Sequence, residues 1–162
     1  MGEIKNSAPG HIKDSEGIQK VWSYFIHNGI SVPFQMFVLA FIPIPFLYLL
    51  NIFSTCALLG IFLGIALRAD AKLGFHLFIS SIPHSIVEIF AYCLFAAVLS
   101  EMNQTIRIGI KNLFKKNKEE MVQMDGFVNV IRVYVILVIP FIVAAAFLET
   151  YFADVVFNLL QY

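Results

Sequence analysis

Charged residues are scarce in this chain and missing from one long stretch of it. Only 14% of the 162 residues are charged, and none of the 47 residues from Val21 to Leu67 is Lys, Arg, Asp or Glu. A soluble domain is about one quarter charged, so this composition excludes an ordinary soluble fold. The chain is 59% hydrophobic with a mean hydropathy of +0.81. These values predict an all-α, polytopic integral membrane protein in the cell membrane.

Motifs of soluble enzymes and of cofactor sites are also missing. The sequence contains no Walker A loop, no GxGxxG, no GxSxG and no HExxH, so we expect a non-enzymatic protein without cofactors. Basic and acidic residues balance at 11 each, which gives no argument for nucleic acid. Cys56 and Cys93 lie in apolar stretches, as buried small residues do. His27, His76 and His84 are too far apart to suggest the ligands of a metal site.

The first 20 residues are polar and precede a single membrane domain predicted over 21–157. No apolar signal-peptide core lies among them, so we expect no cleaved signal. The next segment places Ile18, Val21, Trp22 and Phe25 at helical spacing. Aromatic residues favour the membrane–water interface, so this pattern predicts an amphipathic interfacial helix.

Apolar stretches define the membrane spans. A helical crossing needs about 20 apolar residues, so the uncharged stretch before Arg68 has room for two crossings. Pro43 and Pro45 interrupt helical hydrogen bonding and place a turn between them. The predicted spans are 29–46, 48–67, 73–100 and 133–157.

The distribution of Lys and Arg favours a re-entrant third element. Six of these residues lie in 101–132, two in 68–72 and three before the first span. If 73–100 crosses once, they divide five to six between the two sides. If it enters and leaves on one side, all 11 fall together, as the positive-inside rule favours. This arrangement places the N-terminus and a basic loop at 101–132 in the cytoplasm.

Pro83 supplies a place for the third element to break. Proline disrupts the preceding helical turn, and Ser85 to Glu88, "SIVE", matches a helix capping box. A re-entrant or broken element is therefore our first interpretation. The alternative is one tilted helix of 28 residues over 73–100, kinked at Pro83.

Three of the ionisable residues inside the predicted spans stand out. His84 and Glu88 are four residues apart, so they share one face of a helix, and Glu149 lies in the last span. A carboxylate at the bilayer centre costs about 3 kcal/mol or more. Such residues usually face the interior of a bundle and mark pathways or partner contacts. They form a candidate intramembrane polar site, with structural stabilisation and transport or partner binding as alternatives, and catalysis as the least favoured.

Two further groups of residues suggest contacts with partners. Gly60 and Gly64 form a GxxxG pair, which allows close helix packing either within the chain or in a homodimer. The 101–132 segment carries basic residues that suit a cytoplasmic partner or anionic lipid headgroups. These residues are Arg107, Lys111, Lys115, Lys116 and Lys118.

Several segments in this order resemble the stage II sporulation protein M family. They are "YFIHN" (24–28), "PHSIVE" (83–88) and "PFIVAAAFLETYF" (140–152), and the resemblance covers residues 21–157. Ser85 stands where the family usually has glycine after the histidine. The resemblance implies a multi-span membrane subunit without catalysis of its own.

The resemblance suggests several functions. Sporulation members of the family work in an envelope complex with peptidoglycan-degrading partners, which suggests a scaffold for such enzymes. Shorter relatives resemble the permease-like partners of ABC ATPases in export of circular bacteriocins or in immunity to them. The residues themselves leave open a stand-alone proton-coupled carrier or channel that uses His84 and Glu88.

Overall fold

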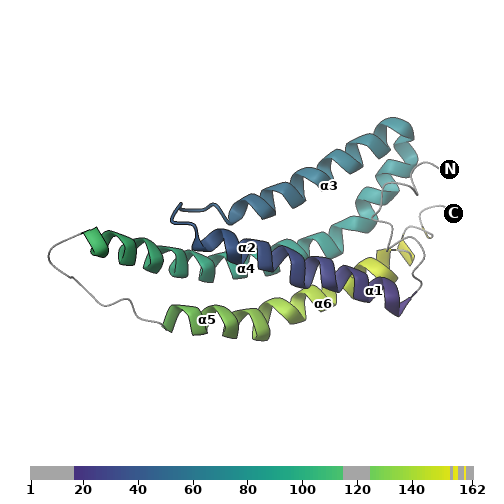
Figure 1. Ribbon diagram of the computed structural model, residues 1–162. Helices are drawn as coiled ribbons and strands as arrows, with labels where there is room; N and C mark the ends of the chain where they lie inside the picture. Colours follow the sequence, from purple (N-terminus) through teal and green to yellow (C-terminus); the bar gives the residue numbers. More distant parts are fainter. Residues whose placement is uncertain (1–16, 115–124, 154, 157–158, 160–162) are drawn as a thin grey trace.

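The computed structural model describes residues 17–114, 125–153, 155–156 and 159, and these residues contain helices and no strand. Four helical runs are long and apolar enough to cross a membrane. They extend over Ile18–Phe41, Leu49–Ala69, Ala71–Asn112 and Gly126–Phe152. The structure therefore confirms an all-α, multi-pass membrane bundle (Figure 1).

The first run joins three elements without a turn between them. It comprises α1 (Ile18–Tyr24), the π-helical segment η2 (Phe25–Ser31) and α2 (Val32–Phe41). The expected interfacial helix is thus not a separate element, because the helical backbone continues from it into the span. The wider turn of η2 keeps the run continuous up to Pro33, which lies in the first turn of α2.

A short non-helical connection follows α2, where the two prolines predicted a turn. It contains Phe46, whose φ of 64° is positive, and leads into α3 (Leu49–Ala69). The side-chain amide of Asn103, on a later helix, donates to the carbonyls of Ala40 and Ile42 at 2.8 and 2.7 Å. The first bond satisfies an acceptor that the end of α2 would otherwise leave free, and the second adds to the bond that the Ile44 N–H donates to the Ile42 carbonyl.

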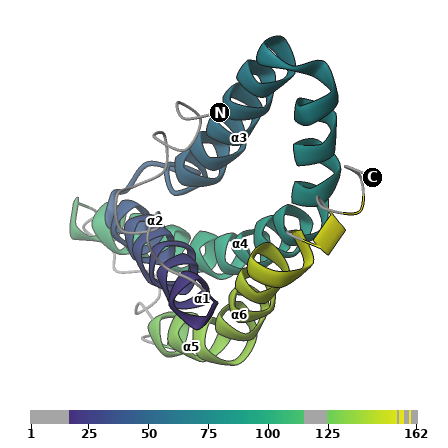
Figure 2. The same ribbon diagram turned by 90° about the vertical axis from the view of Figure 1, so that its right-hand side faces the viewer.

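The longest helix corrects two expectations. α4 covers Ala71–Phe114, 44 residues, and Pro83 lies inside it. Its two ends lie at opposite ends of the molecule (Figure 1), so α4 is neither broken at Pro83 nor re-entrant. Membrane helices tolerate proline because neighbouring groups satisfy the freed backbone atoms. α4 nevertheless changes direction along its length (Figure 2), and a proline is a usual cause of such a kink.

The segment expected as a basic loop at 101–132 is helical wherever the structure describes it. Residues 101–114 complete α4, and α5 (Asp125–Val133) begins the last run. The run continues through η3 (Tyr134–Val138), α6 (Ile139–Phe147) and η4 (Leu148–Phe152).

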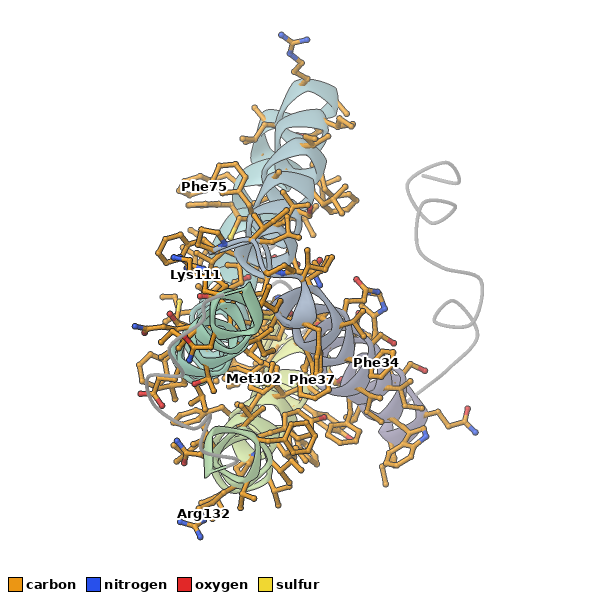
Figure 3. All side chains as sticks on the ribbon, turned by 60° about the vertical axis from the view of Figure 1, so that its left-hand side comes forward. Phe34, Phe37, Phe75, Met102, Lys111 and Arg132 are labelled. Carbon is orange, nitrogen blue, oxygen red and sulfur yellow. The ribbon has the colours of Figure 1, made fainter. Side chains whose placement is uncertain are left out.

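The hydrophobic core lies between α2, the later part of α4 and the last run. Met36, Tyr92 and Leu99 are fully buried there, together with Val138 and Ile142 on the last run. Figure 3 shows the Phe37 and Met102 side chains where α2 and α4 face each other. We call this part of the molecule the bundle.

α3 packs with the start of α4 in a hairpin that projects from the bundle (Figure 2). The helices approach closely at Gly74, where an added Cβ would lie 2.6 Å from the Leu67 backbone. Only glycine fits this contact. α3 buries just Leu63 and Ala66, so most of its apolar surface remains exposed. We call α3 together with the start of α4 the hairpin.

Candidate functional site

A cavity of about 360 Å³ opens between the hairpin and the first and last runs. His84, Glu88 and Glu149 all line it. The structure therefore brings the three predicted intramembrane polar residues to one place, from α4 and η4. The other lining residues are Tyr24, His27, Asn28, Val32, Thr55, Cys56, Leu58, Leu59, Phe62, Ser85 and Ile89.

Pro33 removes one backbone donor from the first run beside this cavity. In a regular α-helix residue 33 would donate its N–H to the Gly29 carbonyl, and in a π-helix to the Asn28 carbonyl. Proline has no N–H, so it donates to neither. Inside a membrane such carbonyls need another donor, because water is absent.

Two tyrosine hydroxyls supply these donors. Tyr92 on α4 donates to the Asn28 carbonyl at 2.9 Å, and Tyr134 in η3 donates to the Gly29 carbonyl. Both bonds join the first run to distant parts of the chain. The polar groups near the cavity thus also hold the first run against α4 and the last run.

Tyr92 connects this backbone arrangement to the predicted acid. Its hydroxyl lies 2.8 Å from Oε1 of Glu88, one turn earlier on α4. A tyrosine hydroxyl has a single proton, and here it faces two acceptors. Glu88 is only 8% exposed, so this hydroxyl is the principal polar contact that the structure gives its carboxyl group.

Glu149 has a different set of neighbours. The Tyr24 side chain forms a hydrogen bond with its carboxyl group, and the Lys20 ammonium lies near enough to attract it. Glu88 is also close enough for the two carboxyl groups to interact electrostatically. Two acids, from helices far apart in the sequence, thus form a pair at the cavity.

His84 is buried beside the acids without pairing with them. It is 9% exposed, and its Nδ1 has no hydrogen-bond partner. The expected interaction between His84 and Glu88 is therefore absent among the described residues. The expected capping box is wrong as well, because Ser85 and Glu88 lie in the middle of α4, where no helix begins.

Three π-helical segments converge on this region. η2 contains His27 and Asn28, η4 contains Glu149, and η3 contains Tyr134, which reaches back to η2. Isolated π-helical turns in α-helices occur frequently at functional sites. Because η2 and η4 line this cavity and η3 bonds to η2, we take the cavity as the candidate functional site of the molecule.

The cavity offers carboxyl and imidazole groups within a helical membrane domain. Such an arrangement suits the binding of a cation or the transfer of a proton. Among the described residues, no group of three or more His, Cys, Asp or Glu side chains is placed to hold a metal ion.

The remaining predicted contact residues that the structure describes lie away from the cavity. No heavy atom of the described residues lies within 4 Å of a Cβ added at Gly60 or Gly64, so the two glycines pack against none of these residues. Arg107 and Lys111 lie on the last turns of α4, and Figure 3 shows the side chain of Lys111. Lys115, Lys116 and Lys118 lie outside the described residues.

Sequence analysis missed the residues that organise the site. Tyr92 lies four residues after Glu88, a spacing that places the two on one helix face, so this contact had a sequence signal. Asn28 and Gly29 act through their backbone carbonyls, and Tyr134 meets one of them across 105 residues. Pro33, an isolated proline inside a span, was the sequence signal for these contacts, because its missing N–H indicates that a nearby carbonyl needs another donor.

The comparisons with known proteins agree with the resemblance seen in the sequence. No curated protein and no solved structure matches the chain. A family model described as stage II sporulation protein M matches residues 3–154, which is nearly the whole sequence. The chain therefore belongs to the stage II sporulation protein M family.

Proposed function

We propose that this protein is a non-enzymatic membrane subunit of a multi-protein envelope complex, in which α3 binds another membrane-spanning chain. The observation that carries the proposal is the poor packing of α3, which buries only Leu63 and Ala66 in a helix of 21 residues. Lipid alone can cover such a helix. The glycine pair on its surface, however, is better suited to another helix.

The partner that fits this surface best is a second copy of the chain. Gly60 and Gly64 lie one turn apart with open space around them, and glycines at this spacing let two backbones approach closely. The neighbouring Phe53 and Ile61 are exposed and would flank the contact. A homodimer would place two hairpins side by side and double the number of spans.

The basic end of α4 is the proposed docking site for an ABC ATPase, as in peptide export or self-immunity. Arg107 and Lys111 lie there, near the start of α5, which carries Arg132. Because α4 runs from one end of the molecule to the other (Figure 1), docking at this end puts Ile18 on the opposite side of the membrane. The N-terminus and the basic segment therefore cannot both be cytoplasmic, although both were expected there.

Cysteine cross-linking tests the dimer. In a variant without the native cysteines, Gly60→Cys should form disulfide-linked dimers in native membranes. Ile65→Cys, also exposed but on another side of α3, is the matched control and should cross-link at least about tenfold more slowly. Equal rates for the two variants would contradict a dimer through the glycine face.

Gentle purification from native membranes with mass spectrometry tests the complex. A stoichiometric ATPase that is lost when Arg107 and Lys111 are both changed to Glu would support the permease-like function. A peptidoglycan hydrolase would instead support a scaffold for envelope remodelling. Recovery of the chain alone, at all detergent strengths, would contradict a multi-protein complex.

The cavity favours a second candidate, a stand-alone proton-coupled carrier or channel that uses His84 and Glu88. Both residues line an intramembrane space with Glu149, as the ionisable residues of many transporters do. The protein alone in liposomes should then give a proton-driven flux that is lost in Glu88→Gln. Liposomes without flux, containing monodisperse protein, would contradict this function.

A further inference from the structure

We propose that the cavity beside Glu88 and Glu149 is a binding site for an organic cation, an ammonium or guanidinium group carried on an apolar body. This inference goes beyond the proposed function and does not depend on the dimer or on an ATPase. Its ligand would reach the cavity from within the membrane.

The acid pair provides the first part of the argument. Glu88 and Glu149 both line the cavity and are close enough to interact electrostatically. Tyr92 is the hydrogen-bond partner of Glu88, whereas Glu149 has Tyr24 as a hydrogen-bond partner and the Lys20 ammonium nearby. A carboxyl group has two oxygens and about four acceptor positions. Acceptor positions therefore remain for a ligand that brings several N–H donors, as ammonium and guanidinium groups do.

His84 provides an independent observation. Its side chain lines the same cavity, is 9% exposed, and has a buried Nδ1 without a partner. A buried polar atom without a hydrogen bond costs free energy, and in native proteins such an atom often marks a site that another molecule completes. His84 thus forms part of the cavity wall beside the acids and carries a buried ring nitrogen without a partner.

The walls of the cavity fit the apolar body of the ligand. Leu58, Leu59 and Phe62 of α3 line the side opposite the acids' helices, with Val32 and Ile89 completing the apolar part. A volume of about 360 Å³ lies within the range of small-molecule sites, about 300–1,000 Å³. A cationic head with a short aliphatic stem fits such a site, and a lysine side chain or an amphiphilic amine each has this form.

The neighbouring surface of α3 gives such a ligand a route. Cys56 lines the cavity, and Gly60 and Gly64 follow it one and two turns later on α3, with nothing packed on them. Residues four apart share a helix face. A membrane-inserted chain lying along this face would therefore reach the cavity with one of its side chains.

Cys56 also provides a reporter for the test. It is an exposed cysteine in the cavity lining, whereas Cys93 is exposed and outside it. Single-cysteine proteins, Cys93→Ser and Cys56→Ser, would react in detergent with two thiol reagents of similar size and opposite charge. These reagents are trimethylammonioethyl and sulfonatoethyl methanethiosulfonate.

A cavity that attracts cations predicts a charge preference at Cys56 alone. The rate ratio of the cationic to the anionic reagent should be at least about tenfold higher at Cys56 than at Cys93, the size expected for one nearby unit charge. The double variant Glu88→Gln, Glu149→Gln should remove most of this difference, with size-exclusion chromatography as the control for folding. Equal ratios at the two cysteines of otherwise unchanged protein would overturn the proposal.

Protection of Cys56 from neutral methyl methanethiosulfonate then identifies the source of the cation. Dodecylammonium would be compared with a transmembrane leucine peptide of about 20 residues that carries one central lysine. Dodecanol and the same peptide with leucine at the central position are the matched neutral controls. Stronger protection by the lysine peptide supports a membrane-inserted chain as ligand, and protection by dodecylammonium alone supports an amphiphilic amine. No protection by either cation relative to its control would overturn binding.

Discussion

The bundle and the hairpin are stabilised in different ways, although both consist of apolar helices. In the bundle, Met36, Tyr92 and Leu99 have no exposed surface, whereas Phe53 in the hairpin is 79% exposed. The bundle is held by interlocking side chains and by tyrosine hydrogen bonds to backbone carbonyls. In the hairpin, α3 buries only Leu63 and Ala66, and Gly74 allows a close backbone contact with Leu67. The bundle therefore has a core of its own, while the hairpin presents most of its surface to lipid or to a partner.

Removing a large side chain should show the difference between the two regions most clearly. Leu99→Ala opens a cavity in the bundle and should lower the free energy of unfolding by about 2–5 kcal/mol. Leu50→Ala in the hairpin, where the side chain is exposed, should change it by less than about 0.5 kcal/mol. Unfolding in mixed micelles of mild detergent and dodecyl sulfate measures both. Equal losses would show that the hairpin is as well packed as the bundle.

A methyl group added at Gly74 should disturb the hairpin and leave the bundle intact. The new Cβ would lie 2.6 Å from Leu67 backbone atoms, which cannot move without separating the helices, so we expect a loss of about 1–3 kcal/mol. Gly64→Ala, where space is open, is the control. Protease cleavage near Asp70 should increase only in Gly74→Ala. Unchanged cleavage would mean that the helices do not approach there.

Removing the hydroxyl of Tyr134 should weaken the contact of the first run with the last. Tyr134→Phe leaves the Gly29 carbonyl without its donor, which costs about 1–2 kcal/mol for a buried acceptor. Tyr151→Phe, an exposed tyrosine, should have no effect. Thermal unfolding in detergent compares the two variants. A Tyr134→Phe protein as stable as its control would contradict the proposal that Pro33 leaves the Gly29 carbonyl in need of this donor.

The smallest effect is expected for Glu88→Gln. The glutamine amide can donate to the Tyr92 oxygen while the tyrosine proton serves Asn28, so stability should change by less than about 1 kcal/mol. Glu88→Leu has no such donor and should lose more. The unfolding assay used for Leu99 distinguishes them. A large loss in Glu88→Gln alone would show that a carboxylate is needed to hold the bundle.

Features that depend on length and composition could be predicted from the sequence. Uncharged stretches of sufficient length form helices able to span a membrane. Pro43 and Pro45 marked a turn because proline cannot donate the backbone hydrogen bond that would continue α2. Pro83 was misread as a break. The effect of a proline depends on whether the surroundings satisfy the freed carbonyl, and nothing near Pro83 in the sequence shows this.

Part of the candidate site could be predicted from the sequence for a similar reason. His84, Glu88 and Glu149 stand out because ionisable residues are rare in apolar spans. The partners of the site were not visible, because Asn28 and Gly29 act through carbonyls that any residue type possesses. Gly74 was missed because its role depends on the backbone of Leu67, across a turn whose geometry the sequence does not give.

α4 is long enough for a small change of angle within it to move its far end by a large distance. At about 1.5 Å per residue its 44 residues extend about 66 Å, roughly twice the hydrocarbon thickness of a bilayer. Pro83 divides it into a short arm beside the hairpin and a long arm through the bundle. A change of about 10° in the angle between these arms would move the far end, near Lys111, by about 7 Å relative to the hairpin. A small rearrangement around the cavity would thus become a large displacement at the basic end.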